Sequence, residues 1–96
     1  MEKKQKIEIY ADVLERLIKH LQERNDVQNI DLMNLSGFCR NCLSKWYVSA
    51  AEKKGFKVDY DQARELIYGM SYQEWKNKFQ TKATKEQIEK WNSKKN

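Results

Sequence analysis

The chain has 96 residues, with no proline, three glycines and two cysteines, and it carries 19 lysines and arginines against 14 aspartates and glutamates. A chain of this length forms one domain with a small core, and two cysteines are too few for the disulfide framework of a small secreted protein. No run approaches the roughly 18 consecutive apolar residues that a membrane span needs, so we expect a cytoplasmic protein without membrane association.

The net charge of +5 comes from the C-terminal end of the chain. Residues 76–96 hold seven lysines and two glutamates, whereas the charges of residues 1–75 cancel. The basic residues form no patch interleaved with stacking aromatic side chains, so nucleic-acid binding is not expected. We divide the chain into one helical domain, residues 1–92, and a short basic C-terminal tail, residues 93–96.

The first predicted element is an amphipathic helix over about residues 6–24. Asn25 and Asp26 end its pattern, because their side chains compete for backbone hydrogen bonds. Charged residues such as Glu8 and Lys19 fall on its polar side. Its apolar side chains recur at the i, i+3, i+4, i+7 spacing of a helix, at Ile7, Tyr10, Leu14, Leu17, Ile18 and Leu21.

The stretch from Val27 to Gly55 allows two interpretations, which differ at Gly37. In the first, a short helical turn ends near Leu35 and Ser36 caps a second helix over about 37–54. In the second, one long helix runs through Gly37 at a cost of about 1 kcal/mol. Both direct Arg40, Asn41, Lys45 and Lys53 more toward solvent. Both form one apolar stripe from Leu35, Cys39, Cys42, Leu43, Trp46 and Ala50.

Three capping patterns begin further helices: Asp59 with Gln62, Ser71 with Glu74 and Thr84 with Gln87. They predict short helices over about 60–68 and 72–80. A last helix carries Ile88 and Trp91 on a thin apolar face, and we expect it to fray unless it docks. No strand pattern is present, so the sequence predicts an all-α fold, a small compact bundle of four to five helices.

Cys39 and Cys42 form the one motif with chemical content. Their i, i+3 spacing places both sulfurs on one helix face, close enough to share a metal ion or to form a disulfide. A structural zinc site takes four ligands and His20 is the only histidine, so zinc or iron would need thiolates from both chains of a homodimer. Redox chemistry would need a low-pKa thiolate, which the first turn of a helix starting at Ser36 favours. We favour burial in the core, because free cysteine is among the most buried residue types.

Polar side chains gather beside the cysteines more densely than a helix connection requires. One interpretation is capping and loop hydrogen bonding, and the other is a polar pocket or a surface for a protein partner. The residues are Gln28, Asn29, Asp31, Asn34, Arg40 and Asn41.

Two segments resemble an uncharacterised bacterial family, domain of unknown function 1244. They are residues 27–47, VQNIDLMNLSGFCRNCLSKWY, and residues 68–76, YGMSYQEWK, and the resemblance extends over nearly the whole chain. It implies a compact helical bundle that occurs as a small stand-alone protein, and it implies no particular activity. A proline commonly stands in the family where this chain has Ser71, and either residue suits a helix start.

No Ser-His-Asp set, pair of catalytic carboxylates or phosphate-binding loop can be assembled from the sequence. We therefore expect a non-enzymatic binding or interaction module with a protein partner. The alternatives are a protein that binds zinc or iron through Cys39 and Cys42, shared across a homodimer, and a thiol redox protein that uses the same pair.

Overall fold

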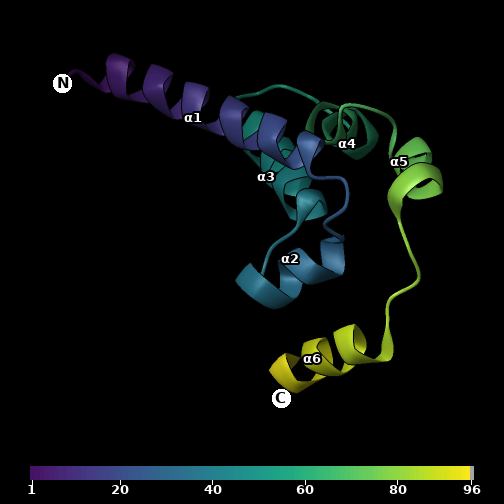
Figure 1. The fold of residues 1–96 in the computed structure, drawn as a ribbon. Helices are drawn as coiled ribbons and strands as arrows, with labels where there is room; N and C mark the ends of the chain where they lie inside the picture. Colours follow the sequence, from purple (N-terminus) through teal and green to yellow (C-terminus); the bar gives the residue numbers. More distant parts are fainter. Residues whose placement is uncertain (96) are drawn as a thin grey trace.

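The computed structural model describes residues 1–95, which form six helices and no strand (Figure 1). The all-α prediction is confirmed, but the helices outnumber the four to five expected. The short turn predicted before Gly37 is a helix in its own right. The helices are α1 (Lys3–Glu23), α2 (Asn29–Ser36), α3 (Arg40–Lys53), α4 (Tyr60–Tyr68), α5 (Tyr72–Phe79) and α6 (Lys85–Lys95).

Gly37 separates α2 from α3, as the first of the two interpretations predicted. Its φ is 81°, a left-handed conformation that ends a helix readily at glycine, and its N–H donates to the carbonyl of Met33 at 2.9 Å. The prediction that Ser36 caps this second helix was wrong. Cys39, with an extended backbone, precedes the first turn of α3, so this helix begins three residues later than expected.

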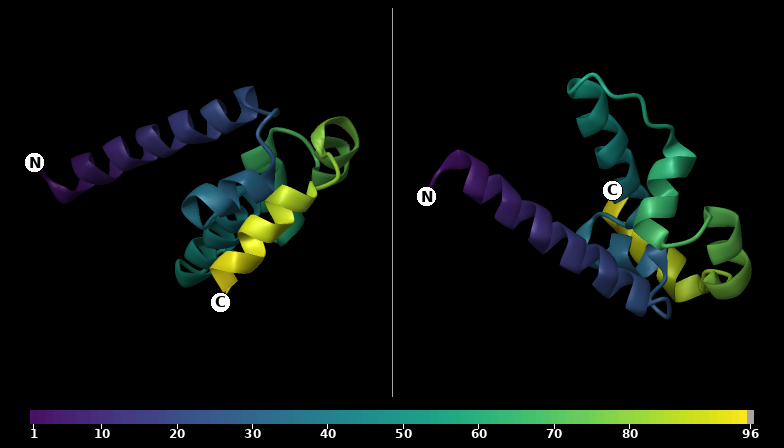
Figure 2. Two further views of the ribbon diagram at one scale, coloured as in Figure 1. Left: turned by 60° about the horizontal axis from the view of Figure 1, so that its bottom comes forward. Right: turned by 90° about the horizontal axis from the view of Figure 1, so that it is seen from above.

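Helix α6 docks against α2 rather than fraying (Figure 2). The amide of Asn34 donates to the carbonyl of Gln87 at 3.1 Å, and the amide of Gln87 donates to Asp31 at 2.8 Å. Residues 93–95 of the predicted tail continue this helix, and Asn96 lies outside the described residues.

The core lies where the C-terminal end of α1 meets α3, α4 and α5. Its buried members are Leu21, Leu43, Ile67, Tyr68 and Trp75. Trp75 is fully buried, and the Tyr68 ring meets it edge to face with the centroids 5.1 Å apart. The core is therefore small and centred on two aromatic rings.

Helix α1 extends far beyond this core (Figure 2, left). Every residue from Met1 to Leu17 is exposed, and Leu21 is the only buried residue of the helix. The radius of gyration is 15.3 Å, compared with about 12.5 Å for a compact domain of this length. The bundle is thus less compact than the sequence predicted. None of the helices within residues 1–95 is long and apolar enough to cross a membrane.

Two glycines with similar backbone conformations give a prediction about the contact between α1 and α4. A Cβ at Gly69, where φ is 77°, would lie 3.0 Å from the side chain of Gln22, whereas a Cβ at Gly37 would meet nothing within 4 Å. We expect Gly37→Ala to cost about 1 kcal/mol from the left-handed conformation alone. Gly69→Ala should cost more, because Gln22, whose side-chain amide donates to the carbonyls of Leu66 and Ile67 on α4, must also move.

Urea unfolding of both variants measures the difference. Equal losses would show that Gln22 adjusts freely and contributes little to the contact.

Candidate functional site

The side chain of Arg40 is buried, with an exposed fraction of 1%. The prediction that it points toward solvent was wrong. Its Nη1 donates to the carbonyl of Val27 at 2.8 Å and to Asn29 Oδ1 at 3.0 Å. Its Nη2 donates to the carbonyl of Arg24 at 2.9 Å and to that of Leu21 at 3.4 Å. These carbonyls end α1 and form the turn into α2, so Arg40 ties that turn to the start of α3.

The guanidinium of Arg40 also lies over the ring of Trp75, 5.0 Å from its centroid. The indole nitrogen of Trp75 donates to Asn25 Oδ1 at 3.0 Å, in the same turn. Burial lowers the pKa of Arg40, yet carbonyl dipoles and the aromatic face supply negative potential around the cation. Helix α5 is thereby joined to the same centre.

A chain of hydrogen bonds continues from Arg40 to the phenol of Tyr68. Asn29 accepts from Arg40 and donates its amide to the Tyr68 hydroxyl at 3.0 Å, and this hydroxyl donates to Asn41 Oδ1 at 2.7 Å. Burial raises the pKa of Tyr68, although the hydrogen bond from Asn29 opposes the rise. The phenol is therefore held in its neutral form.

All six polar residues predicted to gather beside the cysteines make side-chain hydrogen bonds within the chain. Gln28, for example, donates to the carbonyl of Phe79 at 2.8 Å and accepts from the amide of Thr81 at 3.1 Å. Gln28, Asn29 and Asn41 also line a small hollow of about 260 Å³. The contacts favour the capping and hydrogen-bonding interpretation, and a partner surface at these residues stays a prediction.

Cys39 and Cys42 occupy different environments. Cys39 is buried with 7% of its surface exposed, and this burial raises the pKa of its thiol, although the backbone amides of Cys42 and Asn41 oppose the rise. Cys42 is half-buried, with its sulfur 3.9 Å from that of Met33. Within residues 1–95 no cluster of three or more His, Cys, Asp or Glu side chains could hold a metal ion.

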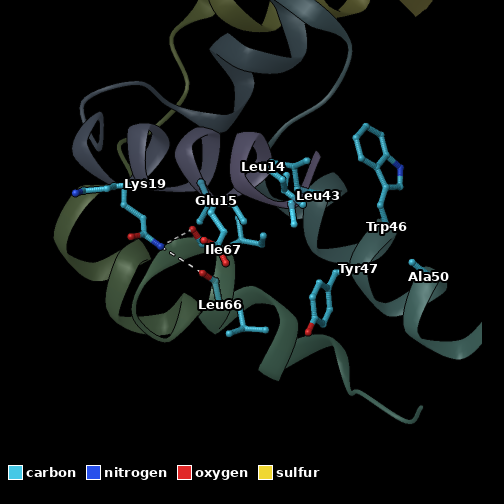
Figure 3. A pocket seen from close by; sticks show the side chains of 12 residues that line it. Leu14, Glu15, Lys19, Leu43, Trp46, Tyr47, Ala50, Leu66 and Ile67 are labelled. Carbon is cyan, nitrogen blue, oxygen red and sulfur yellow. Dashed lines mark hydrogen bonds between the residues drawn. The ribbon is translucent and has the colours of Figure 1, made fainter. Parts of the chain in front are cut away.

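An apolar groove of about 850 Å³, which the sequence analysis did not identify, runs between α1, α3 and α4 (Figure 3). Trp46 and Leu66 on its walls are more than half exposed. At its end, the amide of Gln22 donates to the carbonyl of Ile67 at 3.1 Å and fastens α1 to α4. The main apolar side chains of this groove are Leu14, Ile18, Leu43, Trp46, Tyr47 and Leu66.

The family model described as protein of unknown function (DUF1244) matches residues 27–93. The chain belongs to this family. The DUF1244 match confirms the resemblance seen in the sequence, and it begins after α1. No curated protein matches the chain.

The residues matched by the DUF1244 model include only part of the apolar groove and of the contacts around Arg40. Arg40, its hydrogen-bonded neighbours in α2 and α3, and the α3 and α4 walls of the apolar groove lie inside the matched residues. Helix α1, which forms the remaining wall, lies outside them. Arg40 and Trp75 thus lie in the DUF1244 unit, but some of the groups they bind, at Leu21, Arg24 and Asn25, precede it. The groove is likewise completed by a helix that precedes the unit.

Replacing Arg40 by methionine should destabilise the protein by roughly 3 kcal/mol, because several backbone acceptors lose their donor at once. Arg40→Lys should recover little of this lost stability, since one ammonium cannot reach acceptors on both sides of the turn. Arg24→Met, which removes only an exposed ion pair with Asp26, should cost less than about 1 kcal/mol. Thermal and urea unfolding measure these values. A loss equal to that of Arg24→Met would show that the buried guanidinium is dispensable.

The raised pKa of Tyr68 predicts how the free energy of unfolding depends on pH. Its folded-state pKa lies above the unfolded value of about 10, so its contribution to stability is complete below pH 10 and is lost as the pH rises toward the folded-state pKa. The free energy of unfolding should fall between about pH 9 and 11.5 less steeply for Tyr68→Phe than for the wild type. Tyr10→Phe, at an exposed position, should follow the wild type. If the free energy of unfolding fell with pH at the same rate in all three proteins, burial would not be raising the pKa of Tyr68.

Proposed function

We propose that this protein is a non-enzymatic interaction module that binds an amphipathic helix of a protein partner in the apolar groove. The observation that carries the proposal is the extent of exposed apolar surface along α1 and the groove walls. The large apolar side chains there expose on the order of 1,000 Å², whereas the largest apolar patch of a typical monomer is about 300–600 Å². They are Ile7, Tyr10, Val13, Leu14, Leu17, Trp46, Tyr47 and Leu66.

The shape and chemistry of the groove support a helix as its occupant. Its walls are themselves helices, and a further helix packs between them by placing residues at i, i+3, i+4 and i+7 against the apolar side chains. Trp46 and Tyr47 provide the aromatic anchors that carry much of the binding energy in such sites. Glu15 and Lys19 place both signs of charge on the rim, as on the polar edge of an amphipathic helix.

The thiol alternatives have less support. Redox chemistry needs an accessible thiolate of low pKa, whereas burial raises the pKa of Cys39. A metal shared across a homodimer needs both sulfurs at a surface, and Cys39 is 7% exposed. Two free cysteines suit a reducing compartment, so the proposal places this module in the cytoplasm, and the family resemblance points to a bacterial cell.

The test uses a fluorescein-labelled synthetic helix with leucines at i, i+3, i+4 and i+7, whose fluorescence anisotropy is followed as protein is added. Trp46→Ala should weaken binding about 30-fold, the effect of losing an aromatic anchor worth about 2 kcal/mol. The matched control is Leu35→Ala, because Leu35 is 83% exposed on α2 and does not line the groove. Saturable binding that Trp46→Ala leaves intact would place the helix site elsewhere and contradict the proposal.

A further inference from the structure

Helix α1 has an apolar face that residues 1–95 leave largely uncovered. Isolated helices of about 12 to 15 residues are marginal in water, and helices in proteins are stabilised mainly by packing their apolar face. Every residue of α1 from Lys3 to Leu17 is exposed. Its apolar residues are therefore open to a contact from another molecule.

The spacing on α1 identifies the geometry of that contact. Ile7, Tyr10, Leu14, Leu17 and Leu21 follow one another at intervals of three, four, three and four residues, which is the seam of a two-helix coiled coil. We call these residues the α1 seam. Leu21 is buried in the chain's own core, and the first four are 38–60% exposed. The seam thus begins in the core and continues into solvent.

We propose that a second copy of this chain covers the α1 seam, so that two α1 helices pack antiparallel and each N-terminal half lies along the apolar groove of the other copy. This proposal rests on the proposed function and names the helix that fills the groove. A two-fold arrangement fits, because α1 supplies both a groove wall, through Leu14 and Ile18, and a projecting helix that can enter another groove (Figures 1 and 2). The exposed apolar surface, on the order of 1,000 Å² per copy, is comparable with the roughly 800 Å² that each partner buries in a standard interface.

The charges on α1 disfavour the parallel direction. Its first turn contains Lys3, Lys4 and Lys6 and no acidic residue, so a parallel pair would place six lysines together. In an antiparallel pair, the two sets of lysines are separated and each lies beside the C-terminal half of the partner helix. The dipole is negative there, and Glu15 and Glu23 offset Arg16 and Lys19. Around a crossing near residue 12, Tyr10 of one copy meets Leu14 of the other, and Ile7 meets Leu17.

Sedimentation equilibrium of the full chain tests the second copy. The wild type should have twice the mass of the 11.6 kDa chain. Ile7→Glu, in the seam, should raise the dimer dissociation constant at least 30-fold. Ile9→Glu is a matched control, because Ile9 is on the same helix, 47% exposed, and outside the seam; it should remain dimeric. Equal effects of the two substitutions, or a monomeric wild type at submillimolar concentration, would overturn the proposal.

Disulfide cross-linking tests the direction. When the Ile7→Cys and Leu17→Cys variants are mixed under oxidising conditions, antiparallel packing yields a mixed disulfide between the two introduced thiols, identified by peptide mapping. Predominant linkage of Ile7→Cys to itself would show a parallel pair and overturn the antiparallel assignment.

The synthetic helix separates this inference from the proposed function. Ile7 does not line the groove, so the Ile7→Glu monomer should bind the helix more tightly than the wild type, whose groove is filled. A wild type that is monomeric but binds the helix leaves the proposed function intact and excludes the second copy as occupant. A monomer that binds no helix contradicts both.

Discussion

The guanidinium of Arg40 lies where the end of α1, the start of α2, the start of α3 and the ring of Trp75 on α5 meet, and the arrangement of these four helices depends on it. A buried cation needs compensation, and here it comes from carbonyl oxygens and an aromatic face rather than from a carboxylate bonded to it. Helix ends with unpaired carbonyls are ordinarily satisfied by water or caps. In this protein, the end of α1 is satisfied by a side chain from another helix.

The parts of the structure that depend on local chemistry were predictable from the sequence. Helix α4 has the predicted bounds and α5 ends one residue earlier, because Asp59 and Ser71 cap them and Gly69 separates them. The environment of Arg40 was not predictable, since its acceptors lie 11 to 19 residues away in sequence. Helical spacing showed which residues share a face with Arg40, but not that this face would meet a helix terminus.

The groove illustrates a different limit of sequence reasoning. The apolar residues of the first helix were evident from their spacing, and a pattern of this kind ordinarily indicates a core face. The pattern does not specify whether the covering surface belongs to the same chain. Here only Leu21 is buried in the core, with Ile18 packed partly buried against it. Trp46, predicted on the same apolar stripe as Cys39, is 56% exposed beside the groove. The same types of apolar residue occur in a core and in a binding groove. The two differ in what surrounds the side chain.

The way Arg40 binds the turn between α1 and α2 has a consequence for sequence variation. Its contacts to Leu21, Arg24 and Val27 are all to main-chain oxygens, which every amino acid provides. Side chains exposed on this turn can therefore change with little effect on the contact. An insertion or deletion within residues 21–27 would displace the oxygens themselves, so this turn should tolerate substitution far better than a change of length.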